Sequence, residues 1–87
     1  MKTVLIFNGS CKKGQEIIEK LLSENDLTNN IINNEVICVD KPENADVLQK
    51  FLAFNQFMFI SAENGYPIDL DKKIDTVLIA VDERNRI

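Results

Sequence analysis

Four short apolar runs constrain the fold of this chain more than any other feature of its sequence. Each run is continuous rather than alternating, and most of its residues are β-branched or aromatic. The runs are Val4–Phe7, Val36–Val39, Phe57–Ile60 and Val77–Val81. Strands that are buried on both faces have this pattern, and such strands belong to parallel sheets covered by helices. The runs therefore predict a short parallel sheet.

Segments with helical periodicity separate these runs. The segment Gln15–Ser23 carries an apolar stripe, a second stripe follows Asn44 as a plausible N-cap, and Ile68–Asp75 has the length of about two helical turns. The two stripes consist of Ile17, Ile18, Leu21 and Leu22, and of Val47, Leu48, Phe51 and Leu52. Strands and helices thus alternate along the 87 residues, which predicts a single α/β domain over residues 1–87.

The handedness of the crossovers limits the possible strand orders. Parallel strands are joined by right-handed crossovers, and the usual solution for this element order is a three-layer fold with strand order 2-1-3-4. In that order the first helix covers one face of the sheet and the later helices cover the other. Ligands bind where the order reverses, here between the first and third strands. The loops expected to meet there are Asn8–Gly14 and Ser61–Pro67.

Composition excludes several classes of function. Ten Lys and Arg against fourteen Asp and Glu give a net charge of −4, which argues against nucleic acid or an anionic membrane as the main partner. Because the chain has no His and two Cys, it lacks a zinc site, a Ser-His-Asp triad and a Cys-His dyad. No apolar run approaches a membrane span, and Val4–Phe7 is too short for an export signal, so we expect a cytoplasmic protein.

The first loop, Asn8–Gly14, leads into a predicted helix. Backbone amides at a helix N-terminus form an anion site, to which Ser10 adds a hydroxyl and Lys12 or Lys13 a positive charge. The loop is neither a Walker A motif nor a GxGxxG motif, and the two glycines also suit a simple tight turn.

The second loop, Ser61–Pro67, combines a turn with an aromatic side chain. Asn64-Gly65 is typical of a turn with positive φ, and Tyr66 offers a flat surface on which a planar ring can lie. An ordinary turn, with Tyr66 packed on a neighbouring residue, explains the same residues.

Together these loops resemble a known family. Asn8-Gly9-Ser10-x-Lys12 after the first strand, Glu63-Asn64-Gly65-Tyr66-Pro67 after the third, and Lys73-Ile74-Asp75 beyond them are similar to flavodoxin-like NAD(P)H-dependent FMN reductases. The resemblance implies FMN as cofactor. It implies that Ser10 and Lys12 contact the FMN phosphate, and that Glu63, Asn64, Gly65 and Tyr66 hold the flavin ring.

The chain also departs from this family. Lys12 replaces an Arg, and the fifth strand and final helix of the family have no counterpart, so the FMN site that the resemblance implies is open and weak. Without the final helix, strands three and four are left partly bare on the face of the first helix. We therefore expect that face to be covered by a homodimer or another protein partner.

Two other functions remain open. A thioredoxin- or glutaredoxin-like protein would use Cys11, which lies before a helix and beside Lys12 and Lys13. The chain lacks a CxxC motif and the Pro that such folds place before the third strand, whereas Cys38 is expected in the core. The third hypothesis is a module without enzymatic activity that docks a protein partner.

Overall fold

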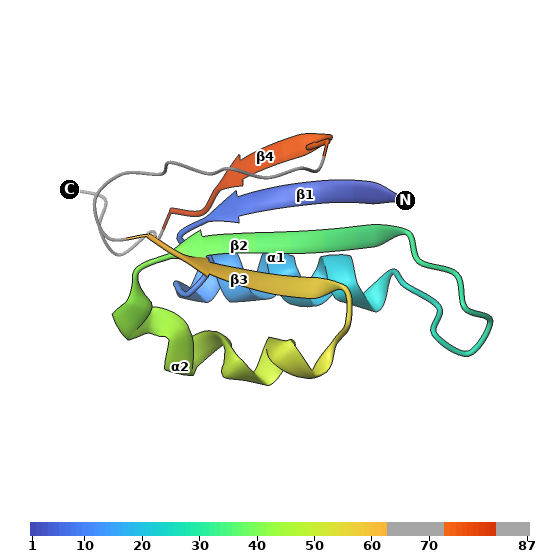
Figure 1. The fold of residues 1–87 in the computed structure, drawn as a ribbon, viewed down its shortest axis with the longest axis horizontal. Helices are drawn as coiled ribbons and strands as arrows, with labels where there is room; N and C mark the ends of the chain where they lie inside the picture. Colours follow the sequence, from blue (N-terminus) through green and yellow to red (C-terminus); the bar gives the residue numbers. More distant parts are fainter. Residues whose placement is uncertain (63–72, 82–87) are drawn as a thin grey trace.

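The computed structural model describes residues 1–62 and 73–81, and its core is one sheet of four parallel strands (Figure 1). The strands are β1 (Lys2–Phe7), β2 (Asn34–Asp40), β3 (Phe57–Ser61) and β4 (Thr76–Ile79). Each apolar run of the sequence overlaps one strand, and all three strand pairs are parallel. The predicted α/β class with a short parallel sheet is confirmed.

The strand order differs from the predicted one. The observed order is β3-β2-β1-β4, so β1 lies between β2 and β4, and β3 pairs with β2. In the register of these pairs, Val4 lies opposite Val36 and Thr76, and Val36 lies opposite Phe57. The predicted order 2-1-3-4 is wrong because it placed β3 beside β1.

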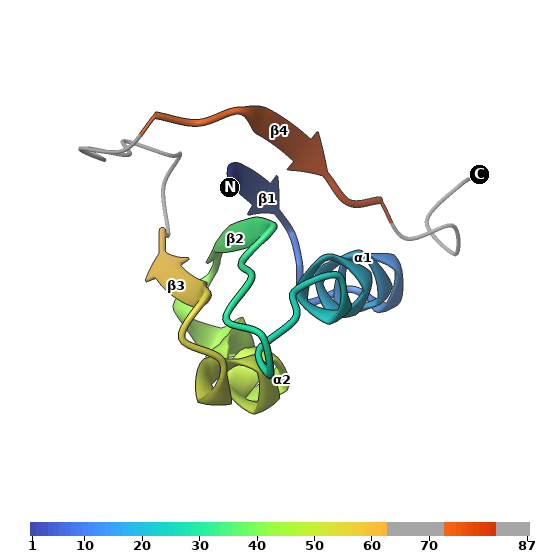
Figure 2. The ribbon, with the colours of Figure 1, turned by 90° about the vertical axis from the view of Figure 1, so that its right-hand side faces the viewer.

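The helices explain this order. Figure 2 shows α1 (Lys12–Ser23) and α2 (Ala45–Leu48) on the same face of the sheet. A right-handed crossover through a helix on that face moves the chain one strand further in the same direction each time, from β1 to β2 and from β2 to β3. The prediction had placed the first two helices on opposite faces.

Both predicted apolar stripes lie on helical segments. α2 is short and is flanked by two 3₁₀ segments, η1 (Pro42–Asn44) and η2 (Gln49–Ala53). Asn44 occupies the N-cap position of α2, but its side chain makes no capping bond there. The stripe residues Ile18, Leu22, Leu48 and Phe51 are buried, whereas Val47 and Leu52 are exposed.

The helix-covered face holds the larger core cluster. Ile6, Val36 and Cys38 of the two central strands pack there with the buried residues of α1 and of the α2–η2 segment. The Phe51 and Phe57 rings lie 5.5 Å apart between centroids, which joins η2 to the start of β3. Cys38 is fully buried, as expected from the sequence.

The opposite face has a smaller core cluster. Leu5, Ile37 and Val39 are buried there, and Ala62 and Ile74 pack against them. These two residues flank the connection from β3 to β4.

The third predicted helix, 68–75, lies largely outside the described residues. Its last three positions, Lys73 to Asp75, are described and are not helical. The Asp75 carboxylate accepts a hydrogen bond from the Thr3 amide at 2.8 Å, and the Asp75 amide donates to the Thr3 carbonyl at 2.9 Å. Asp75 thus fixes the start of β4 beside β1. The predicted three layers are shown only in part, as one sheet with one helical layer.

The expected bare patch was assigned to the wrong face. On the face covered by α1, Phe59 of β3 and Leu78 of β4 are partly buried against the core. The exposed apolar residues are Met58 of β3 and Val77 and Ile79 of β4. Their strand positions put them on the opposite face, where the sheet has no described helix.

Candidate functional site

The turn after β1 joins the carboxyl ends of three strands. Asn8 adopts a φ of 62°, in the left-handed region that asparagine tolerates better than most residues. Its side-chain amide donates to the Ala80 carbonyl just after β4 at 3.0 Å, and its backbone amide donates to the Val39 carbonyl of β2 at 3.2 Å. Asn8 therefore fixes the point from which the chain enters α1.

Gly9 and Gly14 allow the two ends of this turn to approach each other unusually closely. A Cβ on Gly14 would lie 2.6 Å from the Gly9 Cα and 2.8 Å from the Asn8 carbonyl oxygen. A Cβ on Gly9 would lie 2.6 Å from the Cys38 sulfur and 2.8 Å from Cδ1 of Ile18. The start of α1 is therefore packed directly on the end of β1, at a distance that side chains would prevent.

Cys11 caps α1. Its sulfur accepts a hydrogen bond from the Gly14 amide at 3.3 Å, and its carbonyl accepts one from the Gln15 amide at 2.9 Å. Within the described part of the chain, the amides of Lys12 and Lys13 have no acceptor, as is usual in the first turn of a helix. Two donors and two exposed lysines thus lie at the positive end of the helix dipole.

Asp40, the last residue of β2, holds the turn in place. Its carboxylate accepts hydrogen bonds from the amides of Ser10 at 3.1 Å and Lys41 at 2.7 Å, and from the Asn44 side chain at 2.8 Å. Burial raises the pKa of Asp40, but the hydrogen bonds from Ser10, Asn44 and Lys41 outweigh it and hold the pKa below its usual value. A carboxylate with 5% exposure therefore stays ionised at neutral pH beside the turn.

Two of the predicted site residues lie together. Ser10 and Lys12 line an open hollow of about 500 Å³ between α1 and α2, where Lys50 adds a second cation and Glu16 and Glu19 add anions. The backbone amide and the side chain of Ser10, however, both hydrogen-bond with Asp40. Lys12, together with Lys13, is thus better placed than Ser10 to meet an anion.

The other predicted site residues, Glu63, Asn64, Gly65 and Tyr66, lie outside the described residues. They follow β3, and the strand order bears on their expected position. Because β2 separates β3 from β1, the two loops do not leave neighbouring strands. The order reverses between β1 and β4 instead, so the switch point lies there and the predicted one is wrong.

Sequence reasoning missed Asp40. Asp40 directly follows an apolar run. Earlier in the chain, Gly9 and Gly14 have the spacing of the first and third glycines of GxGxxG, and Cys11 occupies the position of the middle glycine. In dinucleotide-binding folds with strand order 3-2-1-4, an acidic residue about 20 positions beyond such a turn binds a ribose hydroxyl, whereas Asp40 lies 26 positions beyond Gly14. This sequence pattern was the available indication that Asp40 belongs to the candidate site.

Neither cysteine forms a disulfide, and they differ in environment. Burial raises the pKa of the Cys38 thiol to about 12, which excludes it as a nucleophile at neutral pH. Cys11 is half-buried and serves as the helix cap. Since β3 and β4 lie at opposite edges of an all-parallel sheet, the described strands lack the hairpin that thioredoxin-like folds contain.

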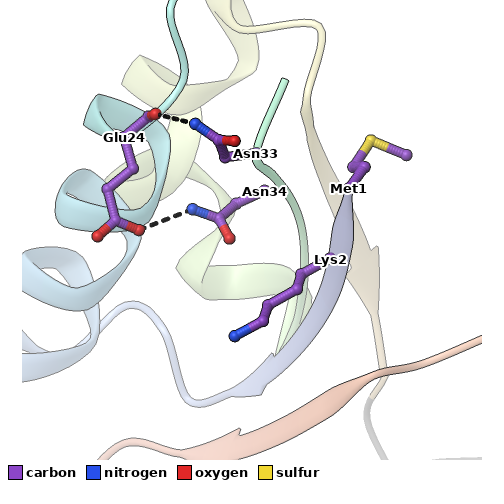
Figure 3. Close-up of a pocket in the computed structure, with 5 residues that line it drawn as sticks. All are labelled: Met1, Lys2, Glu24, Asn33 and Asn34. Atoms are coloured by element: carbon purple, nitrogen blue, oxygen red, sulfur yellow. Dashed lines mark hydrogen bonds between the residues drawn. The ribbon is translucent and has the colours of Figure 1, made fainter. Parts of the chain in front are cut away.

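A second open hollow, of about 600 Å³, lies at the amino end of the sheet (Figure 3). The side-chain amides of Asn33 and Asn34 point toward Glu24 there, and donate to its carbonyl at 2.7 Å and its carboxylate at 2.8 Å. These polar groups satisfy one another and secure the end of α1. Parallel sheets bind ligands at the carboxyl ends of their strands, whereas this hollow lies at the other end of the sheet.

Residues 1–62 and 73–81 contain neither a cluster of metal-ligating side chains nor a membrane-spanning helix. No group of three or more Cys, Asp or Glu side chains in those ranges could hold a metal ion. None of the helices described there is long and apolar enough to cross a bilayer.

Comparison with protein-family models, with curated proteins and with solved structures finds no match for this chain.

Proposed function

We propose that this protein binds a phosphate-bearing nucleotide cofactor at the turn between β1 and α1. The observation that carries the proposal is the close contact of Gly9 with Gly14, at the start of a helix whose first two residues are Lys12 and Lys13. The glycines bring the chain to a tight turn, and the helix N-terminus favours a negative charge. The turn lies beside the switch point of the sheet.

The two lysines support a binding role because they oppose the stability of their own helix. The first turn of α1 contains no acidic residue, whereas negative charges are the ones that stabilise a helix N-terminus. Lys12 and Lys13 are exposed, and neither lies in a salt bridge among the described residues. A bound phosphate would turn this unfavourable arrangement into a favourable one.

FMN and a dinucleotide are the two cofactors to compare. The resemblance to FMN reductases favours FMN, with Ser10, Lys12 and the Glu63–Tyr66 loop as contacts, and a bound flavin would then carry the electrons of an NAD(P)H-dependent reaction. The 3-2-1-4 order of the sheet favours a dinucleotide such as NADH, because dinucleotide-binding folds share this strand order.

Charge reversal at Lys12 and Lys13 tests the proposal. We expect Lys12→Glu with Lys13→Glu to weaken binding of the preferred cofactor at least about tenfold, since two attractive charges become repulsive. The same change should raise the free energy of unfolding by about 0.3–1 kcal/mol per site, because it complements the helix dipole. Fluorescence titrations with FMN and NADH and a urea denaturation series measure the two effects.

Lys20→Glu is the matched control. Lys20 lies in the last turn of the same helix, so its reversal lowers stability by a similar amount and leaves cofactor binding unchanged. If neither FMN nor NADH binds wild-type protein at high micromolar concentration, the proposed function is wrong. If binding occurs but survives reversal of both lysines, the site lies elsewhere.

We further propose that the protein acts as a homodimer in the cytoplasm. The exposed apolar residues of β3 and β4 support an association with another chain, and the two free thiols fit a reducing compartment.

A further inference from the structure

We infer that two copies of this chain join edge to edge through β4 and form one continuous eight-stranded sheet. The inference rests on the proposed homodimer and adds its location and register. We infer a second copy as the partner because the apolar pattern along the edge of β4 is complementary to itself.

The outer edge of β4 offers main-chain groups for pairing. β4 pairs with β1 on one side, and no described strand pairs with its other side. The Ala80 amide donates to the Phe7 carbonyl at 3.0 Å, so the ladder extends one residue beyond the strand. Since alternate residues direct their main-chain groups to opposite sides, the amide and carbonyl of Ile79 face the open edge.

This edge lacks the usual protection against pairing. Edge strands are commonly blocked by charged side chains, prolines or bulges. From Thr76 to Val81 the chain contains neither a charged residue nor a proline. β1 and β2, in contrast, are each paired on both sides, and so need no such protection.

The exposed side chains of the edge follow a symmetric pattern. Val77, Ile79 and Val81 are 56%, 71% and 59% exposed, while Leu78 and Ala80 between them contribute to the helix-covered core. The exposed residues follow the order Val-x-Ile-x-Val in both directions along the chain. The pattern is therefore centred on Ile79.

A two-fold axis at Ile79 satisfies both the main chain and the side chains. Antiparallel pairing about this axis places Ile79 opposite the same residue of the second copy, and Val77 opposite Val81. Each exposed apolar residue then meets another one on the same face. Pairing of β4 with β3 of another copy is head-to-tail and leaves one β4 edge and one β3 edge to pair again, so it would grow into a filament. Pairing of β4 with itself uses both β4 edges and stops at two copies.

Molar mass measured by sedimentation equilibrium tests the interface. We expect wild-type protein to be a dimer, and Ile79→Lys to weaken dimerisation at least about 100-fold, because two like charges would lie opposite each other. Ile79 is exposed, so the substitution leaves the core intact. Met58→Lys, at an exposed apolar position on the other edge strand, is the matched control and should remain dimeric.

Cysteine cross-linking tests the register in a Cys11→Ser background. Opposed residues of a hydrogen-bonded pair lie about 5.5 Å apart between Cα atoms, within disulfide range. We therefore expect Ile79→Cys to give a covalent dimer on oxidation. Val77→Cys alone should not cross-link, whereas Val77→Cys combined with Val81→Cys should.

The outcomes separate the two proposals. A wild-type protein that is monomeric at about 100 μM, a concentration at which dimers of micromolar affinity form, contradicts both the homodimer and its location. A dimer that persists in Ile79→Lys, or that fails to cross-link through Ile79→Cys, supports the homodimer but overturns the β4 interface.

Discussion

Gly14→Ala is expected to destabilise the protein by about 1–3 kcal/mol and to abolish the proposed cofactor binding. The new Cβ would lie 2.6 Å from the Gly9 Cα and 2.8 Å from the Asn8 oxygen, and both are backbone atoms. Relief requires α1 to move away from the end of β1, which would also displace the amides of Lys12 and Lys13. Urea denaturation and cofactor titration of the same variant measure the two effects.

Gly9→Ala provides an internal comparison, because there the obstruction comes from side chains. The new Cβ would meet the Cys38 sulfur at 2.6 Å and the Ile18 Cδ1 at 2.8 Å. Ile18→Val removes that Cδ1 and should recover part of the loss in the double variant, whereas it should not rescue Gly14→Ala. Rescue of both glycine variants to the same extent would show that the turn is not packed as described.

Ile18→Ala is expected to lower the free energy of unfolding by about 2–5 kcal/mol. Ile18 is fully buried and lies beneath Gly9, so its loss leaves a cavity in the larger core cluster. For a chain of 87 residues this is a large fraction of the total stability. Thermal and urea denaturation would measure it.

Two milder substitutions calibrate this result. Ile18→Val removes one methyl group and should lower the free energy of unfolding by about 0.5–1.5 kcal/mol. Ile17→Ala, at the neighbouring and only partly buried position, should have a smaller effect than Ile18→Ala. Equal effects at Ile17 and Ile18 would contradict the orientation of α1 on the sheet.

The strands and the first helix could be predicted from local pattern. Continuous apolar runs such as Val36–Val39 lie in strands because both faces of the central strands are buried, and the stripe of Ile18 and Leu22 faces the sheet. The strand order could not be predicted in the same way. All four runs have similar composition, so nothing local distinguishes the central pair β1–β2 from the edge strands β3 and β4.

The candidate site was predictable only in part. The glycine turn and Lys12 follow from the sequence, because a helix start after a buried strand has free amides whatever the tertiary fold. The bonds between Ser10 and Asp40 do not follow, since they depend on the end of β2 lying beside the first turn. Glu63, Asn64, Gly65 and Tyr66 remain predictions, because they lie outside the described residues.

The position of β4 has a consequence for how the chain folds. From β1 to β3, each strand pairs with the next one along the chain, through a crossover on a single face. β4 must return to β1, and the Thr3–Asp75 bond that begins this pairing closes a loop of 72 residues. Closing a longer loop costs more chain entropy. Residues from β1 to β3 can therefore collapse as one cooperative unit, with β4 joining last and detaching first.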